Sequence, residues 1–164
     1  MKYAVTGHTS GIGKALYENY LPNAVGFSRS NGFNITKDIN KIIDQSKDCD
    51  VFINNAQEGF FQTELLYELS KTFKGKVINI GSMSKDWITG YKKNYKYAVE
   101  KQALNSMNDQ LFWEGFNTSI INLSYVDTSD EKTSEEKINV KYIIEMIDWI
   151  VAQQFRIKDM SARQ

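Results

Sequence analysis

The chain has 164 residues, and its 20 basic and 20 acidic side chains cancel, so we expect no general attraction to polyanions and no nucleic-acid partner. One cysteine, Cys49, excludes an intrachain disulfide, and one histidine, His8, argues against a zinc or other metal site. No apolar run reaches bilayer length and the first residues do not form a secretory leader, which predicts a cytoplasmic protein without a membrane partner.

Short apolar runs alternate with helical patterns along the chain. We predict strands at 2–6, 23–27, 33–35, 50–54, 76–81, 118–124 and 156–160. The helices between them are predicted at 11–20, 37–47, 62–73, 93–114 and 134–153. Strands that alternate with helices pair in parallel through right-handed crossovers. The sequence therefore predicts a single α/β domain over 1–164, with a doubly wound parallel sheet of about seven strands flanked by helices.

The first predicted strand runs directly into Thr6-Gly7-His8-Thr9-Ser10-Gly11-Ile12-Gly13. Glycine at such a turn lets the backbone bend sharply and approach a pyrophosphate, which the helix N–H groups then face. A magnesium-dependent phosphate loop is excluded, because it needs glycine at Ile12. The turn predicts a dinucleotide site, with a ligand-free glycine turn as the alternative. The candidate cofactor contacts are Gly7, Thr9, Ser10, Gly11, Ile12 and Gly13.

The residues after the second predicted strand, Ser28-Arg29-Ser30, indicate which dinucleotide binds. An NAD enzyme places a carboxylate in this region for the ribose 2′-hydroxyl, whereas a guanidinium binds a 2′-phosphate through two hydrogen bonds. With Ser28 and Arg29 here, and Ser30 as a further hydroxyl, NADP is favoured over NAD. The alternative is a solvent-exposed arginine with no ligand.

Tyr97 and Lys101 stand four residues apart on the predicted helix 93–114, so their side chains share one helical face. A phenol has a pKa of about 10, and a nearby ammonium stabilises the phenolate. We therefore expect Lys101, with a positively charged oxidised nicotinamide, to lower the pKa of Tyr97 and make it an acid–base group. The alternative is a solvated pair on a surface helix. The helix is expected to bury a different, apolar stripe of Val99, Ala103, Met107 and Leu111.

Four motifs follow one another in order: the glycine turn, Asn54-Asn55-Ala56, Ser82, and Tyr97-x-x-x-Lys101. Together they resemble the short-chain dehydrogenase/reductase family over nearly the whole chain. The resemblance implies a Rossmann fold and hydride transfer between NADPH and a carbonyl or alcohol. It implies that Ser82 holds the carbonyl oxygen, Tyr97 delivers the proton and Lys101 also bonds the nicotinamide ribose. Ser84 is the alternative to Ser82, because it has the more usual spacing to the tyrosine.

The same resemblance implies further cofactor contacts. Asn34-Ile35 resembles the pair that receives adenine, and Asn55-Ala56-Gln57 resembles the run that lines the adenosine side. Thr128 resembles the threonine that touches the nicotinamide carboxamide.

The chain also departs from the family pattern. Gln57 replaces a glycine, and only 28 residues separate Asn54 from Ser82, so a helix between them is shortened or missing. No residue there matches the asparagine that supports a proton-relay water. A Pro-Gly turn before Thr128 is deleted, and the polar segment 127–137 is expected to be a solvated loop, with a mobile lid as the alternative. The aromatic candidates for substrate walls, each of them a core residue by default, are Phe60, Phe61, Trp87, Tyr91 and Tyr125.

The leading functional prediction is an NADP-dependent reductase of a small carbonyl compound. One alternative is a non-catalytic NAD(P)-binding redox sensor or scaffold, suggested by the missing asparagine and the short substrate segment. Another is a sugar-nucleotide epimerase or dehydratase, whose glycine spacing differs and whose substrate domain finds no room in 164 residues. A homodimer or homotetramer through helix 93–114 is expected, because further apolar residues flank its inward stripe. These are Tyr95, Leu104, Phe112 and Trp113.

Overall fold

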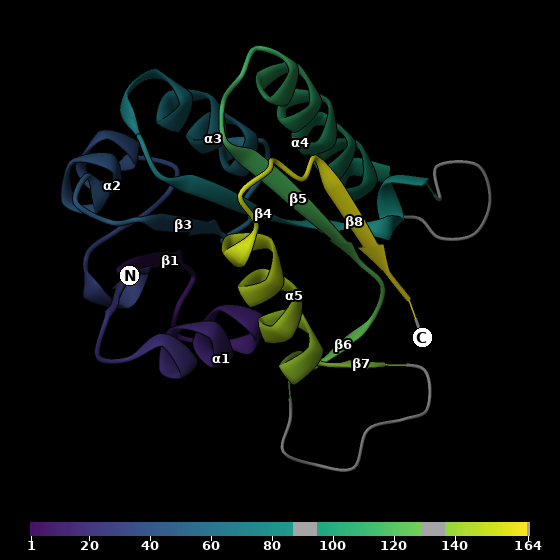
Figure 1. Ribbon diagram of the computed structural model, residues 1–164, viewed down its shortest axis with the longest axis horizontal. Helices are drawn as coiled ribbons and strands as arrows, with labels where there is room; N and C mark the ends of the chain where they lie inside the picture. Colours follow the sequence, from purple (N-terminus) through teal and green to yellow (C-terminus); the bar gives the residue numbers. More distant parts are fainter. Residues whose placement is uncertain (87–94, 129–136, 164) are drawn as a thin grey trace.

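The computed structural model describes residues 1–86, 95–128 and 137–163. Its middle layer is a six-stranded, wholly parallel sheet with the spatial order β2-β1-β3-β4-β5-β8 (Figure 1). The strands are β1 Tyr3–Thr6, β2 Ala24–Phe27, β3 Val51–Asn54, β4 Lys76–Ser82, β5 Thr118–Leu123 and β8 Asp159–Ala162. A separate parallel ladder joins β6 (Val126–Asp127) to β7 (Ile138–Asn139).

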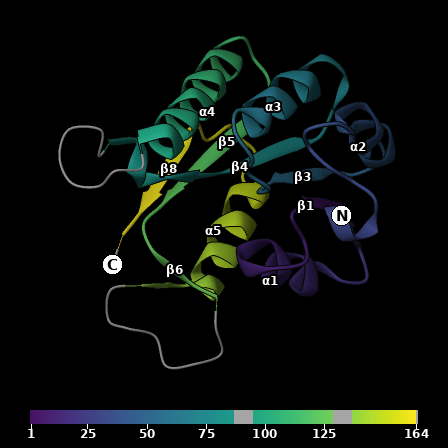
Figure 2. The ribbon, with the colours of Figure 1, turned by 180° about the vertical axis from the view of Figure 1, so that it is seen from behind.

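Helices cover both faces of this sheet (Figures 1 and 2). One face carries α1 (Gly11–Tyr20) and α5 (Val140–Ala152). The other carries α2 (Ile39–Ser46), α3 (Phe61–Thr72) and α4 (Tyr95–Trp113). Two 3₁₀ turns, η1 (Arg29–Asn31) and η2 (Met83–Asp86), follow β2 and β4. The predicted doubly wound α/β sheet is confirmed, and none of the helices described here is long and apolar enough to cross a membrane.

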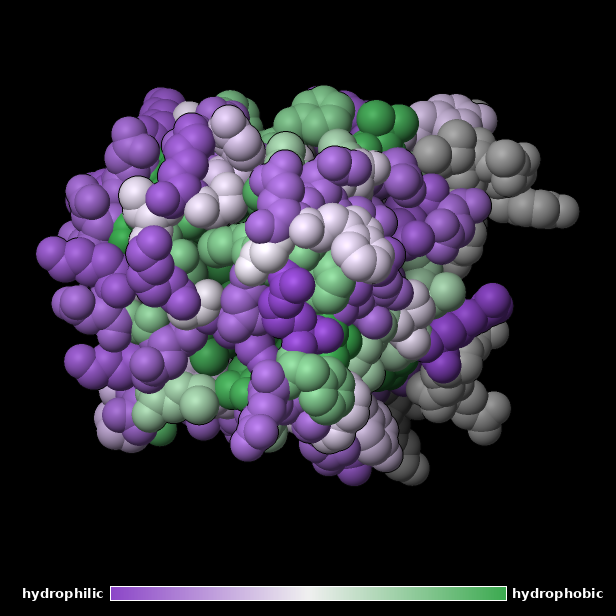
Figure 3. Space-filling model, turned by 45° about the horizontal axis from the view of Figure 1, so that its top comes forward, coloured by the Kyte–Doolittle hydropathy of each residue, from purple (hydrophilic) through white to green (hydrophobic). Residues whose placement is uncertain are grey.

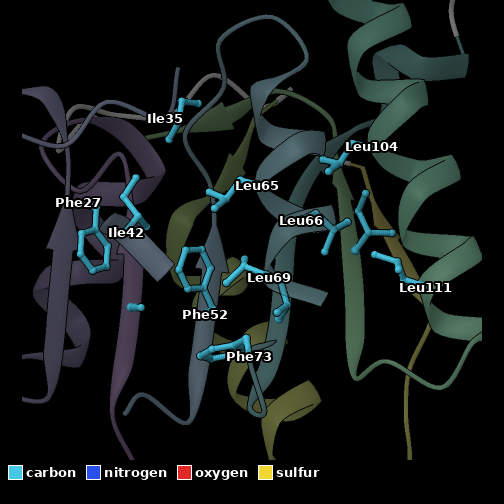
Figure 4. Close-up of a cluster of buried hydrophobic side chains, with 13 residues drawn as sticks. Phe27, Ile35, Ile42, Phe52, Leu65, Leu66, Leu69, Phe73, Leu104 and Leu111 are labelled. Atoms are coloured by element: carbon cyan, nitrogen blue, oxygen red, sulfur yellow. The ribbon is translucent and has the colours of Figure 1, made fainter. Parts of the chain in front are cut away.

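Each face of the sheet has its own apolar core. Phe52 of β3 packs with Leu65 and Leu69 of α3 on the side of α2, α3 and α4 (Figure 4). On the other side, Leu16 of α1 packs with Ile147 of α5. Burying a leucine or isoleucine side chain contributes about 1.5–3 kcal/mol, so the covered sheet is the main source of stability. The face seen in Figure 3 is largely hydrophilic, with hydrophobic residues between the hydrophilic ones.

The topology places one end of the sheet at a switch point. The chain leaves β1 for its neighbour β2 and then returns to β3, which pairs with the opposite side of β1. In an open parallel sheet, ligands bind beyond the carboxyl ends of the strands at such a point. The residues that follow β1, β3 and β4 are thereby brought to a common edge.

The strand predicted at 33–35 is not formed, and the main sheet has six strands. Asn34 heads a turn instead: its Oδ1 accepts from the backbone N of Thr36 at 2.9 Å, and its backbone N donates to Asp38 Oδ2 at 2.8 Å. Short polar side chains that bond nearby backbone compete with a sheet ladder. Local hydrogen bonds therefore replace strand pairing here.

The last two predicted elements form with shifted bounds. The helix predicted from residue 134 begins at Val140, because Ile138–Asn139 is taken by β7 and the Asn139 side chain accepts from the backbone N of Lys141 at 2.9 Å. The strand predicted at 156–160 forms as β8 at Asp159–Ala162. Residues 134–136 lie outside the described part of the chain.

The predicted inward stripe of α4 is wrong in part. Val99 is 46% exposed, whereas Lys101 and Leu104 are buried. The buried side of the helix is the face that carries Lys101. The helix therefore does not bury a stripe separate from the Lys101 face, as the sequence predicted. Apolar periodicity missed it because α4 buries polar side chains as well, including Asn105 and Asn108.

Those polar side chains belong to a network at the centre of the fold. Asn79 of β4 is fully buried; its Nδ2 donates to Thr118 Oγ1 at 3.0 Å and to Asn108 Oδ1 at 3.3 Å. Its Oδ1 accepts from Asn54 Nδ2 at 2.9 Å. The network thus ties β3, β4, β5 and α4 together where side chains would otherwise be apolar.

We expect Asn79→Ala to lower the free energy of unfolding by about 2–4 kcal/mol, because it leaves buried partners unpaired and opens a cavity. Urea denaturation measures the loss. Asn40→Ala on the exposed side of α2 is the matched control and is expected to change stability by less than about 0.5 kcal/mol. Equal stabilities of the two variants would contradict a structural role of the network.

Candidate active site

The glycine turn lies at the switch point, directly after β1. Gly7 has φ +72° and Gly11 has φ +54°, backbone conformations that favour glycine. Gly13 must also be glycine, because an added Cβ would collide with the Gly7 carbonyl oxygen and with the Asn55 amide. Asn55 fastens the turn to β3, since its Nδ2 donates to the Thr6 carbonyl oxygen at 3.0 Å. The turn is therefore built by close backbone packing.

The N-terminus of α1 opens from this turn. Ser10 precedes the helix without a side-chain cap, and no acidic residue stands in the first turn. Thr9, Ser10 and Gly11 are exposed. Helix N–H groups that no side chain satisfies attract an anion. Of the predicted contacts of the turn, Gly7, Thr9, Ser10, Gly11 and Ile12 thus form or border one surface that suits a pyrophosphate, whereas Gly13 is buried.

His8 has a packing role that the sequence analysis missed. Its ring occupies the space above Gly26 of β2, where an added Cβ would collide with it. It also lies against the ring of Tyr17, with the centroids 4.8 Å apart. The His8 ring thereby packs the glycine turn against β2, the strand that leads to Ser28.

Ser28, Arg29 and Ser30 are held in a compact turn after β2. The Ser28 and Ser30 hydroxyls lie 2.7 Å apart, and Ser28 is nearly buried. Asn31 closes the turn, because its Oδ1 accepts from the Ser28 backbone N at 2.8 Å and its Nδ2 donates to the Gly26 carbonyl oxygen at 2.8 Å. Arg29 is exposed, so its guanidinium is accessible to a ligand.

The Asn34-Ile35 turn lies between β2 and α2, and Ile35 is buried. Beside it, an open pocket of about 320 Å³ separates α2 from α3 and is lined by residues such as Thr36, Ile39, Phe61 and Glu64. Across the switch point, Ala56 donates its backbone N to Thr6 Oγ1 at 3.0 Å. The predicted adenine and adenosine contacts thus follow β2 and β3, the two neighbours of β1.

Ser82 and Tyr97 meet at the end of β4. The Ser82 hydroxyl is near enough to the Tyr97 phenol to favour its ionised form as a hydrogen-bond donor. Ser82 is the last residue of the strand, and its Oγ accepts from the backbone N of Ser84 at 3.2 Å, while the two serine hydroxyls lie 2.8 Å apart. Tyr97 thus lies near the serine that ends the strand, and Ser84 is bonded to that same serine.

The pKa of Tyr97 is raised above the usual value of a phenol, contrary to the expectation from the sequence. Burial is the largest cause, and the carboxylate of Glu100 adds to it, while the hydrogen bond from Ser82 opposes them. Lys101 lies close, with its Nζ 5.6 Å from the centre of the Tyr97 ring. A phenol with a pKa of about 10 or higher is protonated at neutral pH, so Tyr97 carries the proton that a donor needs, although the raised pKa makes it a weaker acid.

Lys101 is only 3% exposed, an unusual state for a lysine. Burial lowers the pKa of its ammonium to about 8, and Glu100 partly opposes that shift. The Nζ donates to Gln62 Oε1 at 2.7 Å and to the Ile80 carbonyl oxygen at 3.0 Å. Gln62 is a functional candidate that the sequence analysis did not find. Its only sequence signal is a polar residue in the buried first turn of a helix.

Gln57, which replaces the family's glycine, turns toward α4. Its Nε2 donates to Glu100 Oε2 at 2.5 Å. Glu100 is buried beside Lys101, and the exposed Lys96 lies 3.9 Å from its carboxylate. Gln57 therefore provides a partner for a buried carboxylate next to Tyr97, and its carboxamide engages the protein itself.

The substrate side of the site is described only in part. Thr128 follows β6 and is exposed, as is Tyr125. Phe60 is exposed just before α3, whereas Phe61 packs against the core. Trp87, Tyr91 and most of the polar segment 127–137 lie outside the described residues. No group of three or more possible metal ligands occurs within the described ranges.

Comparison with solved structures shows the same fold in known dehydrogenases. A small-chain dehydrogenase has a TM-score of 0.80 at 15% identity, with 99% of this chain and 96% of that chain covered. Serine dehydrogenase from Escherichia coli has a TM-score of 0.75 at 14% identity, with 100% and 98% covered. UDP-N-acetylglucosamine 4-epimerase from Bacillus cereus also has a TM-score of 0.75, at 15% identity, with 100% and 78% covered.

No family model and no curated protein matches the sequence. At 14–15% identity the likeness establishes a shared fold. The fold implied by the motif order, that of the short-chain dehydrogenases/reductases, is confirmed. Because an epimerase shares it, the fold does not distinguish the reactions, and the activity depends on the residues of the site.

Proposed function

We propose that this protein is an NADP-dependent oxidoreductase of the short-chain dehydrogenase/reductase type, which transfers hydride between NADPH and a small carbonyl or alcohol substrate. The observation that carries the proposal is the meeting of Ser82, Tyr97 and Lys101 beside β4. The glycine turn follows β1 at the same edge of the sheet. A structure of a small-chain dehydrogenase in complex with NADPH has a TM-score of 0.78 at 15% identity and supports this type of cofactor.

The residues fit such a cofactor in separate places. The glycine turn and the N-terminus of α1 would receive the pyrophosphate, and Ser28, Arg29 and Ser30 would receive the 2′-phosphate. Asn34-Ile35 and Asn55-Ala56-Gln57 would border the adenosine half. Tyr97, Lys101 and Thr128 would border the nicotinamide half. When bound, NADPH supplies the hydride.

The chain's own groups would handle the carbonyl oxygen and its proton. Ser82 would donate a hydrogen bond to this oxygen and orient it, and Tyr97 would give the oxygen its proton as negative charge develops. Tyr97 is protonated at neutral pH, as the reductive direction requires. The ammonium of Lys101 would stabilise the phenolate that remains.

We expect Tyr97→Phe to reduce turnover of a carbonyl substrate by roughly 10²–10⁴-fold, because phenylalanine keeps the ring and removes the proton. NADPH affinity should change little. Stopped-flow or steady-state absorbance of NADPH measures the rate. Tyr95→Phe, at an exposed tyrosine of the same helix, is the matched control. Undiminished reduction in Tyr97→Phe would reject the mechanism, and a wild type that binds NADPH without turning over any carbonyl compound would favour a redox sensor or scaffold.

We expect the wild-type protein to bind NADPH more tightly than NADH, and Arg29→Asp to reverse that order. A charge-assisted hydrogen bond contributes about 1.5–3 kcal/mol, so its loss alone weakens NADPH by about ten- to a hundredfold. Nicotinamide fluorescence gives both dissociation constants. Lys47→Asp makes the same charge change at the exposed end of α2 and should leave the preference intact. Equal wild-type affinities for the two cofactors would remove the case for NADP.

We also propose a homodimer or homotetramer that uses the outer face of α4. Three of its exposed side chains are apolar: Tyr95 is 61% exposed, Val99 46% and Trp113 76%. Leu104, predicted to flank the stripe, is buried within the subunit and does not contribute. An apolar helix face gains stability when a second copy covers it.

Analytical ultracentrifugation should therefore show an oligomer at micromolar concentration. Val99→Glu should dissociate it, since a carboxylate in the contact carries a desolvation cost. Trp149→Glu, at a half-exposed aromatic residue of α5, is the control and should leave the assembly unchanged. A wild-type monomer would overturn this proposal.

A further inference from the structure

Gln62 occupies an unusual place for a glutamine. It stands in the first turn of α3 with 2% of its side chain exposed. Its Nε2 donates to the Asn54 carbonyl oxygen at 2.7 Å and to the Ile80 carbonyl oxygen at 3.1 Å. Its Oε1 accepts from Lys101 Nζ at 2.7 Å. One carboxamide therefore connects β3, β4 and α4.

These partners fix which way the carboxamide points. Carbonyl oxygens only accept hydrogen bonds, so the two from Asn54 and Ile80 require the NH₂ group of Gln62 to face them. The Oε1 must then face Lys101, which is a donor only. No other orientation of the carboxamide satisfies all three partners. The protein thus presents a fixed acceptor to the buried ammonium.

Lys101 is held from two sides as a result. Of its three N–H bonds, one goes to Gln62 and one to the Ile80 carbonyl oxygen. Among the described residues no acceptor is found for the third, which is available to a ligand. The ionisable groups near it in the described part of the chain, Glu100 and Tyr97, are both on α4. The contact from α3 is neutral and comes from Gln62.

We propose that Gln62 is a positioning residue, whose carboxamide holds the Lys101 ammonium in place and in its charged form beside Tyr97. The inference rests on the proposed function for its consequence in catalysis, but the contact itself belongs to the free protein. The proposal assigns a role to the short connection between β3 and β4. The helix α3 begins seven residues after Asn54, so Gln62 lies directly against the ends of the strands.

Two substitutions separate positioning from simple stability. Gln62→Met keeps the length of the side chain and removes the acceptor, so the pKa of Lys101 should fall below its value of about 8. Gln62→Glu replaces the neutral acceptor by a carboxylate, so the pKa of Lys101 should rise. NMR titration of the lysine Nζ or Cε signals in the cofactor-free protein measures both, with Lys101→Met to assign the signal.

Asn108→Leu is the matched control. Asn108 is a buried carboxamide on the same helix as Lys101 and bonds Thr118 and the Lys158 carbonyl oxygen. Its loss should lower stability and leave the titration of Lys101 unchanged. An unchanged pKa of Lys101 in the Gln62 variants would overturn the proposal. If Gln62→Met does not fold, Gln62→Glu decides alone: a raised pKa supports the proposal, and an unchanged or lowered one refutes it.

Cofactor binding provides the second readout. Gln62→Met should weaken the binding of NADPH about tenfold near neutral pH. This is the size expected for the loss of a hydrogen bond to a charged group. The two proposals fail separately. Shifted Lys101 titrations with no NADPH binding to the wild type would refute the proposed function and retain the role of Gln62. NADPH binding to the wild type, together with an unshifted Lys101 titration in the Gln62 variants, would refute the role of Gln62 and retain the proposed function.

Discussion

The burial of both faces of one parallel sheet is the constraint on which the rest of the structure depends. Because the strands run parallel, their carboxyl ends lie at a single edge of the sheet. The chain returns to the opposite edge through a crossover connection, usually a helix, before each new strand. The reversal between β2 and β3 opens that edge beside β1. Gly7, Asn55 and Ser82 reach the same place for this reason, although they are far apart in sequence.

The chain departs most from an apolar core around Lys101. A buried ammonium is costly unless its hydrogen bonds are satisfied and its charge is compensated. Gln62 and the Ile80 carbonyl oxygen provide the former, and Glu100 provides a neighbouring charge that is itself bonded by Gln57. Such an arrangement is difficult to explain by stability alone. A functional role of the ammonium at the ends of the strands explains the arrangement, and the proposed chemistry gives Lys101 such a role.

Fold and activity are separate conclusions here. The same sheet and helices occur in dehydrogenases and in an epimerase, so the likeness alone leaves the reaction open. What favours hydride transfer to a carbonyl group is the position of the Ser82 hydroxyl beside the Tyr97 phenol, which is protonated at neutral pH. A protonated phenol next to a hydroxyl can stabilise and then protonate an oxygen that gains negative charge.

The sequence by itself determined the alternation of strands and helices, the glycine turn after β1 and the placement of Ser82 at the end of β4. These features are local, because they follow from apolar periodicity and from spacing within one segment. Only the tertiary structure decided the contacts of Gln62 with Lys101 and of Gln57 with Glu100. It also decided that the pKa of Tyr97 is raised and not lowered. Each depends on burial or on the meeting of segments remote in sequence, which local patterns do not encode. The missing strand at 33–35 has a different cause, since the hydrogen bonds of Asn34 prevailed over a short β-prone run.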